Sequence, residues 1–214
     1  VNMITSWRDA TDKADWFETE EAGIRVHWLS VPYSNHMSYP RRIIAFIRFA
    51  LRAARKAASF PADVVFATST PLTIALPGAY AARRQGVPMV FEVRDLWPEV
   101  PIALGALKSP LSIRLARQLE RFAYHQSTRV VALAPGMKRG VQATGFPSQN
   151  IDIIPNGCDQ FPTFVPCSKY PFLQQGFFPT DRHRIAYIGT IGIANGVRYI
   201  PSLAAAAREI FGDA

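Results

Sequence analysis

The chain has 214 residues, a formal net charge of +8, 49% hydrophobic residues and 19% charged residues. This composition is typical of a globular protein with a sizeable core, and it contains no apolar run of about 18 residues that could span a bilayer. The two cysteines, Cys158 and Cys167, form no CxxC pair, which argues against a metal site or a disulfide framework. The positive charge predicts an anionic partner, which is nucleic acid, a phosphorylated ligand or an acidic membrane surface.

Strand-like and helix-like segments alternate along the chain. Several of the strand-like segments are near-continuous apolar runs, the pattern of strands covered on both faces. Two of the helices begin at Thr70-Pro71 and Ser109-Pro110, where a capping residue precedes a proline. The predicted strands are 1–6, 24–31, 64–68, 87–93, 129–134, 151–155 and 185–189. The predicted helices are 39–59, 71–85, 110–125, 135–144 and 197–211. This alternation predicts an α/β fold with a Rossmann-like, doubly wound parallel sheet.

The segment 159–184 differs from the rest of the chain. It contains four prolines and has no clear hydrophobic period, so we interpret it as a connector between domains. Residues 1–158 then form a first domain, and we expect the first strand and helix of that domain to precede Val1. Residues 185–214 form the start of a second domain.

Ligands of doubly wound sheets bind beyond the carboxyl ends of the strands. At the first such end, a strand that finishes at Thr68 leads into a helix whose first N–H groups have no partner within the helix. These groups, with the hydroxyls of Ser69 and Thr70, predict an anion-binding site. The alternative is that this turn only caps the helix.

The second end carries the sequence Glu92-Val93-Arg94-Asp95. The two-residue period of a strand places Glu92 and Arg94 on one side and Asp95 on the other. The Asp95 carboxylate could accept a proton from a substrate hydroxyl or hold a sugar by hydrogen bonds, and Arg94 could neutralise a phosphate. The alternative is an internal ion pair of Arg94 with an acidic neighbour, with the following leucine and tryptophan packed in the core.

The third end is the glycine-rich turn 189–196, with the sequence GTIGIANG. Glycines between a strand and a helix let the backbone approach a phosphate closely. The spacing is not GxGxxG, so a dinucleotide site is not indicated, and an ordinary turn is the alternative. The four histidines share no spacing with one another or with an acid, and we interpret them as structural or surface residues.

One predicted helix stands apart because residues 41–60 contain six basic residues and no acidic one. On a helical wheel, apolar residues fill one face and five basic residues gather on the other. The five are Arg41, Arg48, Arg52, Arg55 and Lys56. This pattern predicts either a surface helix with a solvated basic side or a helix that lies on anionic lipid, where each basic residue contributes about 1 kcal/mol. Nucleic acid is not expected, because aromatic residues are not interleaved with the basic ones.

Four blocks of the sequence resemble glycosyltransferase family 4. The blocks are DVVFATSTPLTIALPGAYAARRQGVPMVFEVRDLWPE, RVVALAPGMKRGVQATGF, IDIIPNGCD and IAYIGTIGIANGV. They follow the family's order and extend the resemblance over residues 1–211, and the nearest branch makes O-antigen or capsule polysaccharide and includes N-acetylfucosamine transferases. The resemblance implies the GT-B fold of two Rossmann-like domains. The first would bind a lipid-linked or saccharide acceptor, and the second a nucleotide-sugar, commonly a UDP-sugar, without a metal or other cofactor.

The resemblance also assigns residues to sites. Asp95 falls in the loop that carries a catalytic or sugar-positioning carboxylate, and Arg94 stands where relatives often have a histidine. Further acceptor-side residues are Ser69, Thr70 and Glu99. The donor-diphosphate loop corresponds to Gly189, Thr190, Gly192, Asn195 and Gly196. The stretch IPNGCD places three residues near the cleft between the domains: Asn156, Gly157 and Asp159.

We therefore expect a retaining, metal-independent glycosyltransferase of cell-surface polysaccharide synthesis, cytoplasmic and held by its basic helix on the inner face of the membrane. The family's glutamate pair for the donor ribose and its glycine-rich first turn are not in the sequence, so we expect these residues alone to be inactive. The alternative is a non-catalytic Rossmann-like module that binds an anionic surface of lipid or nucleic acid. An epimerase or dehydrogenase would need GxGxxG and Tyr-x-x-x-Lys motifs, which are absent from the sequence. No oligomeric state is predicted.

Overall fold

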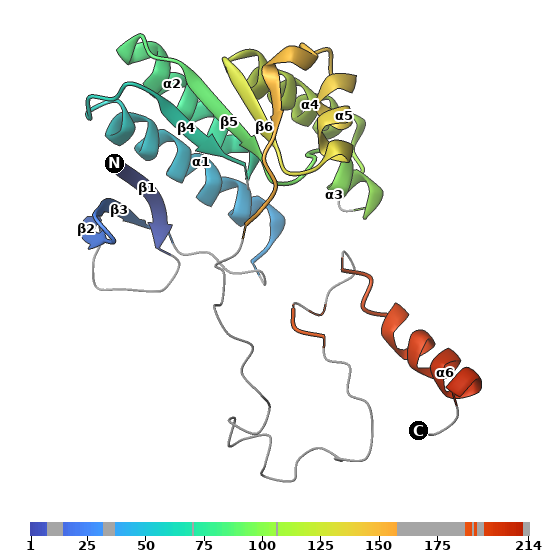
Figure 1. Ribbon diagram of the computed structural model, residues 1–214. Coiled ribbons are helices and arrows are strands. Elements are labelled where there is room, and N and C mark those ends of the chain that lie inside the picture. Colours follow the sequence, from blue (N-terminus) through green and yellow to red (C-terminus); the bar gives the residue numbers. More distant parts are fainter. Residues whose placement is uncertain are drawn as a thin grey trace. The chain divides into compact units, whose positions relative to one another are not determined.

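The computed structural model of the chain describes residues 1–7, 15–31, 37–69, 71–105, 107–157, 187–189, 191 and 195–211 (Figure 1). The chain divides into two compact units, Val1–Asn156 and Gly157–Ala214. The strands are β1 (Asn2–Trp7), β2 (Trp16–Glu21), β3 (Ile24–Ser30), β4 (Val65–Thr68), β5 (Met89–Val93), β6 (Arg129–Ala132) and β7 (Ile151–Ile153). The helices are α1 (Tyr39–Ala57), α2 (Ala75–Gln85), α3 (Glu99–Ala103), α4 (Pro110–His125), α5 (Pro135–Ala143) and α6 (Tyr199–Phe211), with 3₁₀ helices η1 (Leu72–Ile74) and η2 (Ser148–Asn150).

A four-stranded parallel sheet forms the centre of the first unit, in the order β4-β5-β6-β7. Helices lie between successive strands in the sequence, as a parallel sheet requires. This arrangement confirms the predicted α/β fold with a Rossmann-like parallel sheet. Because all four strands run the same way, their carboxyl ends meet at one edge of the sheet (Figure 1).

The main core lies between one face of this sheet and the helices α2, α4 and α5. Alternate residues of β5, namely Met89, Phe91 and Val93, are buried in it, and the neighbouring strand β6 contributes Val130 and Ala132. The helices bring residues of their own to the same cluster, among them Ala79 from α2, Tyr124 from α4 and Val141 from α5. The two-residue period therefore leaves the intervening side chains, such as Glu92, on the opposite face.

Helix α2 approaches the sheet closely at Gly78. A Cβ atom at this position would lie 2.9 Å from the Cβ of Ala67 and 3.0 Å from the sulfur of Met89. Both neighbours belong to buried strand residues, so neither has free space into which to move. The absence of a side chain at Gly78 thus sets how near α2 packs to β4 and β5.

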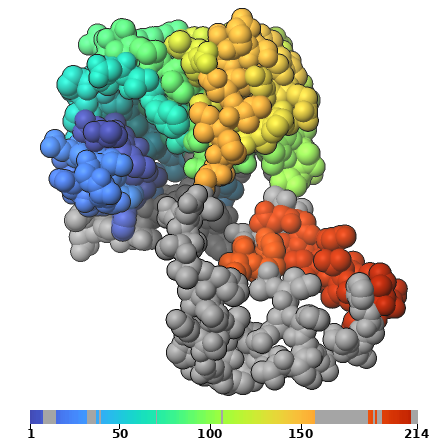
Figure 2. Space-filling view, in the orientation of Figure 1, coloured from blue at the N-terminus to red at the C-terminus, as the bar shows by residue number. Residues whose placement is uncertain are grey.

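A second, three-stranded sheet has the order β1-β3-β2, with β1 parallel and β2 antiparallel to β3. Strand β2 is not among the predicted strands. It is held in part by His27 of β3, which is 1% exposed and contacts the Glu18 carboxylate through Nδ1 at 2.7 Å and the Asn2 side chain through Nε2 at 3.1 Å. This contact confirms a structural role for His27. Figure 2 shows this sheet, in blue, at the surface of the first unit.

Helix α1 differs from the expectation that its apolar residues fill one face, because only some of them are buried. Its buried residues are alanines, Ala45, Ala50 and Ala53. Four aliphatic residues remain between 40% and 64% exposed, namely Ile43, Ile44, Ile47 and Leu51. The helical wheel explains this split, because these four form a separate stripe between the alanines and the basic residues.

The other predicted elements are mostly confirmed, with ends that differ by a few residues. Helix α4 begins at Pro110 as predicted, whereas Pro71 precedes the 3₁₀ helix η1 and α2 begins only at Ala75. The short helix α3 is not among the predicted elements. Of the strand predicted at 185–189, the described residues 187–189 are not in a strand, and the first two lie outside the described residues.

We predict that Gly78→Leu lowers the free energy of unfolding by about 1–3 kcal/mol, because the new side chain overpacks the contact with Ala67 and Met89. The substitution improves helix propensity by about 1 kcal/mol, so the loss must arise from packing. Urea unfolding measures it. The control is Arg84→Leu at an exposed position of the same helix; an equal loss in both variants would contradict the packing explanation.

Candidate functional site

The candidate site lies where β4 and β5 end, and Ser69 joins the two ends. Its backbone N–H donates to the carbonyl oxygen of Glu92 at 2.8 Å, and its Oγ accepts a hydrogen bond from the backbone N–H of Arg94 at 2.9 Å. Ser69 is only 3% exposed. The structure therefore places Ser69 beneath the loop that follows β5, where it fixes that loop to the end of β4.

Glu92 is a site residue that the sequence did not single out. It lies opposite Thr68 in the parallel register, and the Thr68 hydroxyl donates to its carboxylate at 2.5 Å. Both side chains lie on the sheet face opposite the main core. One signal was present in the sequence: a single carboxylate within the apolar run MVFEV at the carboxyl end of a strand.

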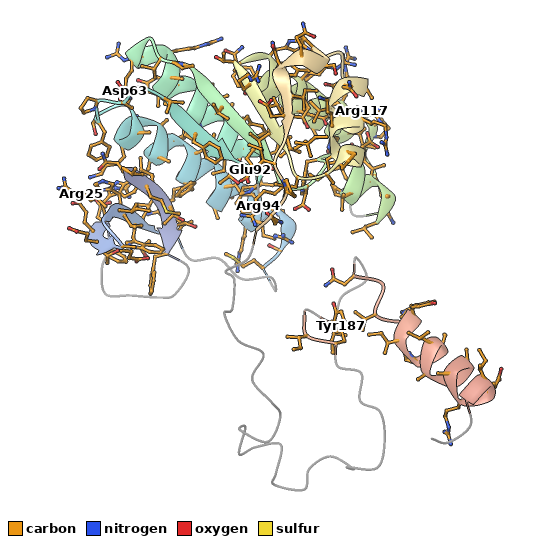
Figure 3. The ribbon with its side chains drawn as sticks, in the orientation of Figure 1. Arg25, Asp63, Glu92, Arg94, Arg117 and Tyr187 are labelled. Atoms are coloured by element: carbon orange, nitrogen blue, oxygen red, sulfur yellow. The ribbon has the colours of Figure 1, made fainter. Side chains whose placement is uncertain are left out.

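Arg94 and Asp95 follow β5 directly, and both are exposed. Figure 3 shows Glu92 and Arg94 at the edge where the strand ends. Within the described residues, Arg94 forms no ion pair, so the alternative of an internal ion pair at Arg94 is not observed there. The structure thus brings two carboxylates, a guanidinium and a hydroxyl to one short stretch of the sheet edge.

The loop after Asp95 is anchored in the core. Leu96 and Trp97 are partly buried against the main core cluster, and Pro98 is buried behind a cis peptide bond with Trp97. Leu96 also packs on Gly140 of α5, where a Cβ atom would lie 2.7 Å from the Leu96 side chain. The alternative interpretation of this stretch therefore holds for Leu96 and Trp97, which do pack on the core. Their packing anchors the chain directly after Asp95.

Glu99 does not join this group. It is the first residue of α3, and its carboxylate pairs with Arg117 of α4 at 3.3 Å. Both partners are more than half exposed, so the pair contributes little to stability. Figure 3 shows Arg117 among the helices, well apart from Arg94.

The remaining predicted site residues are only partly described. Thr70, Asp159, Thr190 and Gly192 lie outside the described residues. The other five are all exposed: Asn156, Gly157, Gly189, Asn195 and Gly196. Asn156 is the last residue of the first unit, a short way after β7, whereas Gly157, Gly189, Asn195 and Gly196 belong to the second unit. Gly196 has a φ of +63°, a conformation that favours glycine.

The predicted basic side of α1 is partly neutralised. Arg52 forms an ion pair with Asp15, and Lys56 pairs with Glu18 at 3.2 Å. Hydrogen bonds from Lys56 and His27 lower the pKa of the Glu18 carboxyl. Arg52, Arg55 and Lys56 line a shallow groove of about 350 Å³ with Trp16 and Ser59. The remaining three predicted basic residues are exposed and form no ion pair or hydrogen bond within the described part of the chain: Arg41, Arg48 and Arg55.

A buried acid lies in α4. Glu120 is 5% exposed, and the Tyr124 hydroxyl donates to its carboxylate at 3.2 Å. Burial raises the pKa of Glu120 from its ordinary value of 4.5 to about 7. The hydrogen bond from Tyr124 opposes this rise, but desolvation outweighs it. The raised pKa thus reflects burial within the helix layer.

None of the helices within the described residues is long and apolar enough to cross a bilayer. Among the same residues, no group of three His, Cys, Asp or Glu side chains is arranged to hold a metal ion.

Comparison with known families identifies the family of the first unit. The family model described as "Glycosyl transferase 4-like domain" matches residues 1–157, which is more than half of the chain. The comparison with curated proteins gave no match. The match ends beside Asn156 and therefore covers the four-stranded sheet and the loop that carries Asp95.

We predict that Glu120→Gln removes a pH dependence of stability. The folded protein keeps the Glu120 proton up to about pH 7, whereas the unfolded chain loses it near pH 4.5, so this group's contribution to the free energy of unfolding falls as the pH rises between those values. The glutamine still accepts the Tyr124 hydrogen bond without a buried charge. At about pH 8 the variant should be more stable by on the order of 3 kcal/mol, and at about pH 4.5 nearly equal to the parent.

Urea unfolding at the two pH values measures this difference. Glu20→Gln, at an exposed position of β2, is the matched control and should show no such change. A stability difference of Glu120→Gln that stays constant with pH would contradict the assignment.

Proposed function

The chain belongs to the glycosyl transferase 4-like family, and we propose that it forms the acceptor side of an enzyme that transfers a sugar to a lipid-linked or saccharide acceptor. A glycosyltransferase uses a nucleotide-sugar donor and an acceptor. We further propose a UDP-sugar as the donor, retention of configuration without a metal, and a role in cell-surface polysaccharide synthesis such as O-antigen or capsule. The family match over residues 1–157 is the observation that carries the proposal.

The chemistry proposed for the acceptor side centres on Asp95. A carboxylate that handles a proton or a sugar hydroxyl must reach the substrate, and Asp95 is exposed on a loop fixed by Ser69 and Leu96. Glu92 and Thr68 supply further hydrogen-bonding groups on the neighbouring strand ends. Arg94 adds a positive charge for a phosphate group of the acceptor.

The donor side of the proposal rests on the glycine-rich turn in the second unit. Glycosyl transfer with a diphosphate leaving group requires stabilisation of that group's charge and of an oxocarbenium-like sugar. The backbone N–H groups of Gly189–Gly196 would contribute to the first requirement. Basic residues elsewhere in the enzyme would supply the rest.

The proposed location is the inner face of the cell membrane, where a lipid-linked acceptor is found. Arg41, Arg48 and Arg55 of α1 are available for anionic headgroups, because they are exposed and form no ion pair within the described residues. Arg52 and Lys56 contribute less, since β2 and the residue before it provide acidic partners. The proposed membrane contact therefore relies mainly on three of the five basic residues that the sequence pattern indicated.

We predict that Asp95→Asn lowers the turnover of the transferase that carries this chain by at least about tenfold, which is about 1.4 kcal/mol of transition-state stabilisation. A screen of nucleotide-sugars for thermal stabilisation identifies the donor for the assay. The control is Asp63→Asn, at an exposed position before β4 and away from the site (Figure 3). Unchanged turnover in Asp95→Asn would remove Asp95 from the mechanism.

We predict that Arg48→Glu/Arg55→Glu weakens binding of the chain to anionic vesicles at least about tenfold, since two attractive charges become repulsive. Vesicle co-sedimentation at low and high salt measures binding, and the difference should shrink as salt screens it. The control is Arg83→Glu/Arg84→Glu, two exposed arginines at the end of α2, which makes the same change of net charge. If the α1 variant binds like the parent, α1 does not contact the membrane.

A further inference from the structure

His27 of β3 is a buried titratable residue outside the candidate site. Its side chain is 1% exposed, and each of its two ring nitrogens contacts an oxygen atom. Nδ1 lies 2.7 Å from Oε1 of Glu18 in β2, and Nε2 lies 3.1 Å from Oδ1 of Asn2 in β1. The ring also stacks on Phe60, just after α1, with 4.5 Å between the ring centroids. This histidine thus links all three strands of its sheet to the end of α1.

The His27 contacts lie between the three-stranded sheet and α1. Glu18 is directly opposite His27 in the register, so both side chains point to the same face of the sheet. Leu29, two residues further along β3, lies on that face as well and packs with Ala45 of α1 in a second core cluster. The pair of His27 and Glu18 therefore joins β2 to β3 at the border of a packed interior.

The two oxygen contacts determine which form of the His27 ring fits. An ionised carboxylate and an amide oxygen are both acceptors, so each ring nitrogen must carry a hydrogen to bond its partner. The form that satisfies both contacts is the positively charged imidazolium. A neutral ring keeps one N–H, which can still donate to Glu18. Its Nε2 then faces the Asn2 oxygen as a second acceptor, and the amide has to turn before that contact becomes favourable.

The charged groups around the ring meet at Glu18. Hydrogen bonds from Lys56 and then from His27 lower the pKa of the Glu18 carboxyl. Lys56 Nζ of α1 lies 3.2 Å from that carboxylate and 5.2 Å from the centroid of the Phe60 ring. Strand β1 has no charged residue. Of the two side-chain types that donate to Glu18, histidine is the one whose charge ordinarily changes between about pH 5 and 8.

We propose that protonated His27 is a pH-sensitive latch that holds β2 on β3. Strand β2 is an edge strand whose last four residues are exposed, so its apolar burial is confined to Trp16 and Phe17. The latch is complete only while His27 is protonated and Glu18 is ionised. Its stabilisation of β2 is lost as the pH rises through the titration of the histidine, and it is lost again in acid, where Glu18 takes up a proton.

Opening of the latch changes the charge of α1. The residue before β2, Asp15, pairs with Arg52, and Glu18 of β2 pairs with Lys56. When β2 leaves β3, these two cations lose their partners, and the positive charge along α1 is no longer offset there. A contact of α1 with anionic lipid would then strengthen at higher pH. This consequence rests on the proposed function, whereas the latch itself does not.

Hydrogen exchange of the β2 amides in the full chain at about pH 6 and about pH 8 tests the latch, after correction for the intrinsic effect of pH on exchange. Nitrogen-15 spectra of the imidazole report directly whether both ring nitrogens of His27 are protonated. His27→Gln keeps a hydrogen-bond donor but cannot be charged, and Glu18→Gln removes the negative partner. Glu20→Gln, at an exposed position of the same strand, is the matched control.

We expect the protection of the β2 amides to fall at least about threefold between the two pH values in the parent and in Glu20→Gln. The fall should be absent in His27→Gln and smaller in Glu18→Gln, and both ring nitrogens of the parent should be protonated at about pH 6. Protection that does not change with pH in the parent would overturn the proposal, as would a neutral ring at about pH 6.

An equal fall in His27→Gln would also count against the latch, because another group would then cause the pH dependence. If that variant does not fold, the parent and Glu18→Gln decide the question, since the Glu18 side chain is 49% exposed and its replacement disturbs no core packing. None of these measurements needs transferase activity. A failure of the latch is therefore distinguishable from a failure of the proposed function.

Discussion

The candidate site depends on the way Ser69 ties the ends of two neighbouring strands together. Its N–H extends the hydrogen bonding of the sheet by one residue to Glu92, and its hydroxyl accepts the N–H of Arg94, the first residue beyond β5. A buried N–H without a partner costs about 1–3 kcal/mol of stability. A residue without a side-chain oxygen at position 69 would leave the Arg94 N–H without this partner. These two hydrogen bonds fix the direction in which the chain leaves the sheet after β5. Arg94 and Asp95 project from this point while Leu96 turns back into the core.

Much of the fold could be predicted from the sequence because the buried strands are apolar runs and the helices between them are amphipathic. The strands β4, β5 and β6 and the helix α4 were located in this way, to within a few residues. Strand β2 could not be found, since its sequence WFETEE is mostly polar and exposed. It is a strand because β3 offers it an edge and because His27, buried in β3, contacts its Glu18. Tertiary contacts of this kind have no local signature.

The site was predictable to the same degree. Strand-end reasoning located Arg94 and Asp95 on the sequence, because the carboxyl end of a parallel strand can be read from a single apolar run. The Thr68–Glu92 pair needed the register between two strands that are 24 residues apart in sequence. The pairing of Glu99 with Arg117 needed the packing of α3 against α4. The sequence of a single strand reveals neither the register with its neighbour nor the packing of the helices. The sequence therefore identified the loop after β5, but not which side chains lie together at it.

The charge distribution shows why net charge alone does not locate an anionic partner. The sequence concentrates basic residues in α1, but Asp15 and Glu18 form ion pairs with two of them and so reduce the positive charge of that helix. Helix α4 carries fewer basic residues, yet two of its arginines keep no acidic partner within the described residues, and its one surface acid neighbour, Glu99, pairs weakly with the third. Attraction to a membrane depends on the charges left after such pairing and on apolar groups beside them. Helix α1 meets the apolar requirement through its exposed aliphatic residues, but its adjoining basic row is already partly neutralised by Asp15 and by Glu18 of β2.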